Sequence, residues 1–277
     1  MSNDTPVVFI GSGEASVLER KTLIYSIRKN TPTPVEIIVF NGTHNTIERE
    51  GHPPELTSMS LRAKYLNTTE FSNYRYLIPE LRGHAGRAIY IDSDMICLHD
   101  LNDLFSMPMH DQDLMALAFT DQRGVPKWGL SVALYDCTRC HFDLDGYVDE
   151  IGQGRFTYND MHQFSPTFLG VHPFKVGAID PQWNCYDEYT PATKLIHYTN
   201  LHTQPWKTRG HPHGALWFDY FDQARAAGYV TEADIDLAIR RGYARQDLRS
   251  GNTISVRSVA RNALSDLKAA VRDVSRA

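Results

Sequence analysis

Two aspartates separated by a single residue, Asp92 and Asp94, are the side chains in this sequence whose type and spacing best suit chemistry. They follow directly on the apolar run Ala88–Ile91, which is typical of a buried β-strand. Carboxylates where such a strand ends can converge on one hard divalent cation and leave positions open for phosphate oxygens. Two acids in a loop are more often merely solvated, but the strand places this pair at the sheet edge where α/β proteins bind ligands.

The elements around this pair alternate between strands and helices. Val7–Ile10 and Val35–Phe40 are predicted strands, and apolar residues between them recur at helical spacing up to Lys29. This alternation indicates an α/β layered fold with a mainly parallel sheet, whereas the turn-rich residues 41–69 are expected to be irregular. The remaining predicted strands are Leu114–Phe119, Ser131–Tyr135, Phe174–Ile179 and Lys194–His197, and the remaining predicted helices are Phe71–Leu81, Asp143–Ile151, Ala215–Ala227 and Glu232–Arg241.

The charge of the chain is small but unevenly distributed. Its 277 residues include 28 basic and 33 acidic side chains, a net charge of −5, which disfavours a generally basic nucleic-acid binder. Residues 240–277 carry +6, which leaves −11 on residues 1–239. After Val256, apolar and basic residues fall on separate faces of a predicted helix, which could lie on an anionic membrane surface or pack on its own domain. We expect a main domain over residues 1–239 and a basic helical tail over 240–277, with any membrane contact made by residues 250–277.

The sequence also bears on compartment and on its four cysteines. No basic segment precedes the first apolar run, and no run reaches the ~18 apolar residues that span a membrane, so we expect a cytoplasmic protein, at most peripheral on the inner face of the membrane. The cysteines are then expected to be thiols. Cys137–His141 matches the haem-attachment pattern C-x-x-C-H, but that chemistry usually needs export. A zinc site would need a second ligand pair, and Cys97 and Cys185 stand alone.

Several longer strings, taken in order, resemble glycosyltransferase family 8 and its bacterial relatives. Phe71–Leu81, Ala88–Met95 and Asp100–Phe105 match in sequence and order, and Ile196–Trp206 is similar to the family's signature of a His followed by Lys-Pro-Trp. Shorter likenesses occur at Pro181–Asn184 and Trp128–Cys137. The resemblance implies a glycosyltransferase-A fold in which residues 1–239 form the catalytic domain. It also implies transfer of a hexose from a UDP-sugar to a glycan or glycolipid acceptor, with retention of anomeric configuration.

The resemblance further implies roles for single residues. Asp92, Asp94 and His197 would bind Mn²⁺, with Mg²⁺ as the alternative, and mixed oxygen and imidazole ligation suits Mn²⁺ better than Ca²⁺. Asp121 and Asp160 match regions that line the sugar and acceptor side. The residues expected to contact the donor are Phe9, Ile10, Gly11, Ser12, Glu14, Arg75, Ser93, Gln204 and Lys207.

Two departures from the family pattern affect this interpretation. Gln204 stands in place of the lysine before Pro-Trp and lies one residue further from the His, so either Lys207 supplies that charge or the metal and Arg75 suffice. Trp128–Ser131 replaces the family's Asn-rich acceptor segment, which leaves the acceptor class open. For retention, Asp160 is the one candidate nucleophile, but front-face attack needs no such carboxylate and fits this sequence better.

Two other classes of function remain open at this level. A sugar nucleotidyltransferase also needs a metal, a nucleotide and an α/β sheet, but it normally has a Gly-rich loop with a nearby cation. Gly11 and Gly13 have no cation nearby before Arg20, and Ser16 stands where a dinucleotide fingerprint needs its third glycine. A non-catalytic protein that binds a sugar nucleotide or glycan is the other alternative, with Gln204 as the mark of lost activity.

Overall fold

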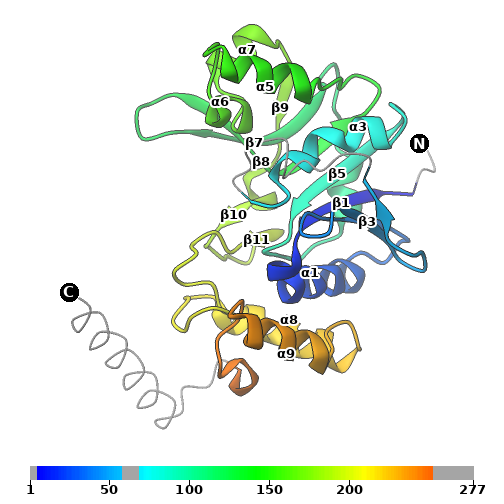
Figure 1. Cartoon of the computed structure of the whole chain (residues 1–277), viewed down its shortest axis with the longest axis vertical. Coiled ribbons are helices and arrows are strands. Elements are labelled where there is room, and N and C mark those ends of the chain that lie inside the picture. Colours follow the sequence, from blue (N-terminus) through cyan, green and yellow to red (C-terminus); the bar gives the residue numbers. More distant parts are fainter. Residues whose placement is uncertain (1–4, 58–68, 252–277) are drawn as a thin grey trace.

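A mixed eight-stranded sheet with the order β4-β3-β2-β1-β5-β8-β7-β9 forms the centre of the computed structural model, which describes residues 5–57 and 69–251 (Figure 1). Its middle strands β2 (Glu36–Asn41), β1 (Val7–Ser12) and β5 (Arg87–Asp92) are parallel. The carboxyl ends of these strands therefore meet at one edge, where Asp92 pairs in register with Gly11. The predicted α/β class is confirmed, and this edge is where such sheets bind ligands.

The flanks of the sheet add mostly antiparallel pairs. β8 (Pro126–Asp136) runs antiparallel to both β5 and β7 (Leu114–Thr120), and β9 (Val176–Ala178) runs parallel to β7. On the other side, β3 (Thr46–Arg49) and β4 (Glu55–Leu56) extend the sheet from β2. The expectation of irregular structure over 41–69 was wrong for these two strands, because strands this short bury too few apolar side chains to show a period of two.

Both faces of the sheet are buried, and successive residues of β1 show how. Val7 and Phe9 belong to one apolar cluster, whereas Val8 and Ile10 belong to a second cluster on the opposite face. The second cluster includes Leu23 of α1 (Val17–Asn30), which covers that face. Burial on both faces explains why the central strands are continuously apolar rather than alternating.

The first cluster is covered by short helices. They are the 3₁₀ helix η2 (Ser72–Leu77) with α3 (Ile78–Leu81), and α5 (Leu144–Gly152), α6 (Tyr158–His162) and α7 (Pro166–Val171). The single helix expected over Phe71–Leu81 is thus two elements. Pro79 explains the division, because proline suits the first turn of an α-helix and α3 begins beside it. The short α4 (Leu101–Phe105) lies on the other face with α1.

A third layer is formed by α8 (Gly214–Ala226) and α9 (Glu232–Arg241), which lie beyond α1, at the end of the molecule opposite α5–α7 (Figure 1). α9 runs through the boundary expected between residues 239 and 240, and Ala244 and Leu248 are buried in the apolar cluster beneath it. Residues 240–251 therefore belong to the main domain. The rest of the predicted tail lies outside the described residues. Among the described residues, no helix combines the length and apolar character needed to cross a membrane.

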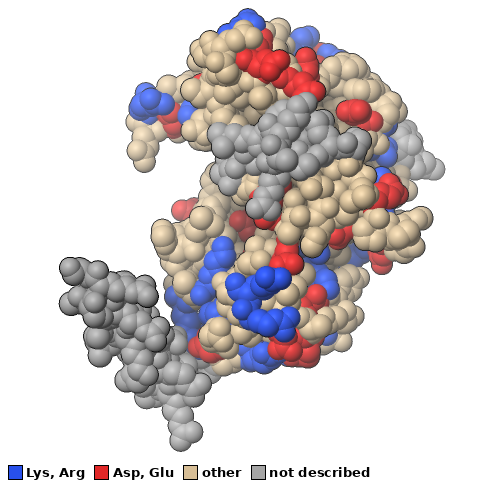
Figure 2. Space-filling model, in the orientation of Figure 1, with Lys and Arg blue, Asp and Glu red and all other residues tan. Residues whose placement is uncertain are grey.

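Lys and Arg side chains gather over the part formed by α8, α9 and the segments beside them (Figure 2). Many of them have acidic partners within the same layer. Arg209 and Arg245 both pair with Asp247, and Arg225 and Arg249 both pair with Glu232. The two pairs with Glu232 are exposed and contribute about 0–1 kcal/mol each, whereas the two with Asp247 are more buried.

Gly42, directly after β2, marks a close approach between two backbone segments next to the carboxyl edge. A Cβ added there would lie 2.1 Å from the carbonyl oxygen of Glu70. We expect Gly42→Ala to lower the free energy of unfolding by about 1–3 kcal/mol, because backbone rather than a flexible side chain must move. Urea unfolding measures this. Gly170→Ala is the control, since its Cβ would meet no atom within 4 Å, and equal stability of the two variants would contradict the prediction.

Candidate functional site

A small three-stranded sheet brings a distant histidine to the aspartate pair. β6 (Met95–Cys97) follows the pair directly and runs antiparallel to β11 (Leu195–His197), which pairs in turn with β10 (Cys185–Tyr186). The register sets His197 opposite Met95, and the amide of Tyr198 donates to the carbonyl oxygen of Asp94 at 2.9 Å. Backbone pairing therefore places His197 beside Asp94, independently of any side-chain attraction.

The Asp94 carboxylate has a partner on each oxygen. Nε2 of His197 lies 3.0 Å from Oδ1, and Nε2 of Gln204 donates to Oδ2 at 3.3 Å. On the other side of the ring, Nδ1 of His197 is hydrogen-bonded to Oδ1 of Asn184 at 3.1 Å. Burial lowers the pKa of His197, but Asp94, Asp92 and Asp187 together raise it by more, so the net shift is upward. The imidazole is thus fixed at both nitrogens, with Nε2 directed at Asp94.

Asp92 faces a different set of partners. Its Oδ1 accepts from the Tyr90 hydroxyl at 2.6 Å and from Nη2 of Arg75 at 3.2 Å. The Arg75 guanidinium is buried and lies 4.7 Å from the centre of the Tyr90 ring. Burial raises the pKa of Asp92, and the positive charge of Arg75 opposes that rise. These charge-assisted hydrogen bonds fix the position of Oδ1 of Asp92.

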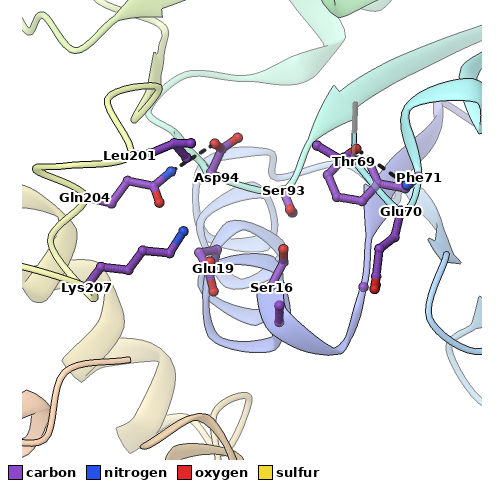
Figure 3. Close-up of a pocket in the computed structure, with 12 residues that line it drawn as sticks. Ser16, Glu19, Thr69, Glu70, Phe71, Ser93, Asp94, Leu201, Gln204 and Lys207 are labelled. Carbon is purple, nitrogen blue, oxygen red and sulfur yellow. Dashed lines mark hydrogen bonds between the residues drawn. The ribbon is translucent and has the colours of Figure 1, made fainter. Parts of the chain in front are cut away.

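A cavity of about 280 Å³ opens beside Asp94 (Figure 3). Figure 3 shows Ser93 and Asp94 on one side of it and the amine of Lys207 directed inward, next to Glu19. Glu70 and Phe71 line the wall across the cavity from Lys207. The other lining residues are Gly13, Ala15, Ser16, Thr69, Leu201 and Gln204.

A second, smaller cavity of about 130 Å³ lies on the Asp92 side of the pair. It contains Arg75, Trp128 and Ser131, together with His162 at the end of α6. Burial lowers the pKa of His162 to about 3, and the nearby charge of Arg75 lowers it further. His162 is therefore neutral at physiological pH and can offer hydrogen bonds without charge. The larger cavity thus contains a lysine, and the smaller one contains Arg75 together with neutral polar groups such as Ser131 and His162.

Six of the predicted site residues line these two cavities. Ser93, Asp94, Gln204 and Lys207 line the larger one, and Arg75 and Asp92 line the smaller one. His197 contacts Asp94 directly.

The strand residues predicted to contact the donor are placed differently. The side chains of Phe9 and Ile10 are buried in the two apolar clusters on opposite faces of the sheet, so a contact with the donor would be made by their backbone groups, and it stays a prediction. The loop that lines the cavity begins later, at Gly13. Gly11 instead permits close packing, since a Cβ there would lie 2.4 Å from the Tyr90 hydroxyl.

Ser12 and Glu14 are also turned away from the cavity. Ser12 is buried and donates its hydroxyl to the carbonyl oxygen of Gly13. The Glu14 carboxylate accepts from the Tyr243 hydroxyl at 3.0 Å and pairs with Arg241. Arg241 is the last residue of α9, and Tyr243 follows it closely in the chain. Glu14 therefore ties the first loop to the C-terminal layer.

Asp121 and Asp160 have structural roles. Oδ1 of Asp121 accepts from the amides of Arg123 and Val125 in the turn between β7 and β8, and the Val125 bond contributes most to lowering the Asp121 pKa to about 2. Asp160 closes the capping box at the start of α6 and accepts from the Ser165 hydroxyl at 2.7 Å. Neither is among the residues that line the two cavities. Their contacts are those of turn and helix capping, and their expected place on the sugar and acceptor side stays a prediction.

Three polar residues at the site were not predicted from the sequence. Glu19 is only 4% exposed, and burial raises its pKa to about 8 although Lys207 opposes the rise. A glutamate on an amphipathic helix is normally assigned to the solvent-facing side, so the periodicity of the sequence did not indicate that Glu19 lies in the site. Asn184 lies in a string that resembles the family, and this resemblance could have indicated its place in the site. No feature of the sequence indicated a site role for His162.

The comparisons with known proteins concern the fold. No family model matches the sequence, and no curated protein matches it. The structure is similar to that of the galactosyltransferase LgtC in complex with donor and acceptor sugar analogues, with a TM-score of 0.62, 13% identity, and coverage of 83% of this chain and 99% of that one. The chain has a glycosyltransferase-A fold. The predicted resemblance in fold to family 8 is therefore confirmed.

Two other glycosyltransferases are similar over part of their length. GlyE from Streptococcus pneumoniae TIGR4 matches with a TM-score of 0.55 and 15% identity over 82% of this chain and 64% of that one. The bifunctional WbbM matches with a TM-score of 0.54 and 16% identity over 87% of this chain and 52% of that one. The chain thus spans about half of WbbM. At these identities the likeness defines the fold and leaves the substrates to be argued from the site.

The donor atoms near Asp94 suit a divalent cation that also binds ligand oxygens. Carboxylate and neutral imidazole are suitable ligands, and Asn184 fixes Nδ1 of His197 in the way that metal-binding histidines require. Two donors already form hydrogen bonds with Oδ1 of Asp92, so Oδ2 is the oxygen of that carboxylate that could bind a cation. In the described part of the chain, no three His, Cys, Asp or Glu side chains gather closely enough to hold a metal ion by themselves. The predicted ligands Asp92, Asp94 and His197 therefore do not form a complete metal site by themselves, and their binding of a cation stays a prediction.

Glu19 makes the stability of the protein depend on pH. Burial raises its pKa from 4.5 to about 8, so between these values the native state keeps a proton that the unfolded chain has released. The stability contributed by this group is full below about pH 4.5 and is lost as the pH rises through about 8. We expect Glu19→Gln to match the wild type near pH 4 and to be more stable above about pH 8, by about 5 kcal/mol at most.

Urea unfolding across this pH range measures the difference. The same substitution at the exposed Glu188 serves as the control, and its stability should follow that of the wild type at every pH. A Glu19→Gln variant that is less stable than the wild type at high pH would show that the carboxylate is a necessary part of the packing.

Proposed function

We propose that this protein is a glycosyltransferase that moves a hexose from a UDP-sugar to a glycan or glycolipid acceptor with retention of configuration, assisted by Mn²⁺ or Mg²⁺. The observation that carries the proposal is the aspartate pair at the carboxyl edge of the sheet, with Asp94 beside His197 and a cavity on each side. The glycosyltransferase-A fold supports it. Ligands of α/β sheets bind at this edge.

The two cavities suit the two parts of a nucleotide-sugar. The cavity beside Asp94 contains the Lys207 amine and the backbone of the Gly13 loop, which suit a diphosphate and nucleoside. The smaller cavity contains Ser131 and the neutral His162, which can exchange hydrogen bonds with sugar hydroxyls without binding charge. The scissile bond would then lie next to the aspartate pair, where the two cavities approach each other.

Asp94 and His197 are the residues that would hold the divalent cation. When bound, such a cation neutralises the charge that develops on the diphosphate as the glycosidic bond breaks. Gln204 is uncharged, so it cannot supply the positive charge of the lysine that the family has at this position. Its side-chain amide instead donates a hydrogen bond to Asp94. Lys207 is the cation of this segment that faces the cavity, so it takes the role of neutralising the leaving group.

Retention is best explained by attack on the face that the leaving group vacates. Both oxygens of Asp160 serve the α6 cap and Ser165, so Asp160 is not disposed to form a covalent intermediate. In front-face attack the acceptor oxygen bonds to the anomeric carbon on the side where the bond to the phosphate oxygen breaks. The departing phosphate oxygen accepts the proton of the acceptor hydroxyl, so no side-chain base is required.

UDP release from a panel of UDP-sugars tests this proposal. We expect release that depends on Mn²⁺ or Mg²⁺, and we expect Asp94→Ala to reduce it at least about a hundredfold because the cation loses a direct ligand. Asp111→Asn, at an exposed acid paired with Lys175, should leave the rate unchanged. Circular dichroism and unfolding curves establish that the Asp94 variant is folded.

The other outcomes point to other functions. Tight UDP binding without turnover of any donor would favour a non-catalytic binding protein, and pyrophosphate release from UTP and a sugar phosphate would favour a nucleotidyltransferase. Neither UDP binding nor UDP release, with or without metal, would overturn the proposal.

A further inference from the structure

Gln204 lines the larger cavity, and only 2% of the residue is exposed to solvent. Its Nε2 group donates to the carbonyl oxygen of Tyr198 at 2.8 Å and to Oδ2 of Asp94 at 3.3 Å. A carbonyl oxygen and a carboxylate both accept hydrogen bonds, so the amide keeps its nitrogen on their side and its oxygen on the other. The orientation of this amide is therefore determined by its two partners.

The side-chain oxygen of Gln204 is left without a partner. Oε1 is buried and forms no hydrogen bond with any residue that the structure describes. Figure 3 shows the nitrogen directed at Asp94 and the oxygen turned away from it, toward the part of the cavity beside the Lys207 amine. Burying an acceptor without a donor is unfavourable, because the oxygen gives up its hydrogen bonds with water. A ligand that brings a donor to Oε1 would remove this penalty.

The chemistry of Oε1 restricts the group of a ligand that can meet it. An amide oxygen only accepts hydrogen bonds, so the ligand must present an O–H or N–H group. Phosphate oxygens are acceptors themselves and would be repelled. A cation shared with Asp94 does not suit Oε1 either, because the nitrogen of the amide and not its oxygen is the atom next to that carboxylate. The unpaired oxygen therefore indicates that the ligand brings a hydrogen-bond donor to this place.

In a nucleoside diphosphate, the ribose hydroxyls are the donors closest to the phosphates. The ribose is joined directly to the α-phosphate, whereas the N–H group of uracil lies on the far side of the base. Gln204 is hydrogen-bonded to Asp94 through its side chain, and its backbone carbonyl accepts from the amide of Lys207 at 2.9 Å. It therefore belongs to the part of the cavity that suits the diphosphate, where a ribose hydroxyl would reach Oε1 while the phosphates face Lys207.

We propose that Gln204 determines specificity for the pentose of the nucleotide, with Oε1 accepting a hydrogen bond from a ribose hydroxyl. This inference rests on the proposed function for the presence of a nucleotide, whereas the unpaired oxygen is a feature of the structure itself. The lysine that the family resemblance predicts at this position has donors alone, so it could not make this contact. Gln204 then serves to select a ribonucleotide and is not a mark of lost activity.

Calorimetry of the full chain with UDP, 2′-deoxy-UDP and 3′-deoxy-UDP in the presence of Mn²⁺ tests this contact. We expect the wild type to bind at least one deoxy analogue about tenfold more weakly than UDP, because the analogue leaves Oε1 buried without a donor. In Gln204→Met and Gln204→Lys, which lack the amide oxygen, the affinities for UDP and for that analogue should agree within about twofold. A wild type that binds both deoxy analogues as tightly as UDP would contradict the proposal.

The two variants separate the acceptor from the other contacts of Gln204. Gln204→Lys keeps a donor for Asp94 and for the Tyr198 carbonyl, so it removes the acceptor but not that support. Gln204→Met removes the acceptor without adding a charge, and thermal unfolding shows which variants are folded, of which one suffices. Gln153→Met, at an exposed glutamine after α5, is the matched control and should discriminate as the wild type does. Equal discrimination in the wild type and in a folded Gln204 variant would refute the proposal.

The ribose contact and the proposed function can fail separately. If UDP is bound and is released from a UDP-sugar, but removal of the Gln204 oxygen does not change the discrimination against the deoxy analogues, the proposed function stands and the ribose contact fails. If UDP is not bound, the proposed function fails, and the same comparison with ADP, CDP and GDP and their deoxy analogues decides the ribose contact. Discrimination that depends on Gln204 then supports the contact, and the lack of binding or of such discrimination excludes it.

Discussion

The contact between His197 and Asp94 is the interaction on which the rest of the site depends. It is made by the pairing of β6 with β11, which joins the strand after the aspartate pair to a segment about a hundred residues further along the chain. Once that pairing is formed, Asn184 orients the imidazole and Gln204 supports the other carboxylate oxygen. The Lys207 loop follows directly from the same segment, so the charge facing the cavity is also set by this pairing.

A second constraint is that two carboxylates one residue apart cannot both be buried without separate compensation. Asp92 is compensated from the sheet side by Arg75 and Tyr90, and Asp94 from the small sheet by His197 and Gln204. Asp92 lines the smaller cavity and Asp94 the larger one. The separate partners of the two half-buried carboxylates thus accompany the division of the site into two compartments.

The parts of the fold that the sequence predicted were those with strong local signals. The central strands are continuously apolar, and the aspartate pair stands where one of them ends, so both could be located without a structure. His197 came from the resemblance alone, since nothing local shows that its strand pairs with Met95. The side chains of Phe9 and Ile10 are buried in two different cores because side chains alternate along a strand, so the predicted donor contact of these residues depends on their backbone groups and stays a prediction. Glu19 was missed because its burial depends on a loop that lies far away in sequence.

The larger cavity is lined by more acids than bases among the described residues. Glu19, Glu70 and Asp94 line it together with Lys207, and Asp92 lines the smaller cavity. Under the proposed function, a diphosphate would bring further negative charge, and a divalent cation shared with Asp94 and His197 would offset that charge. Phosphate oxygens would then complete the ligands of the cation, and metal affinity and donor affinity would be coupled.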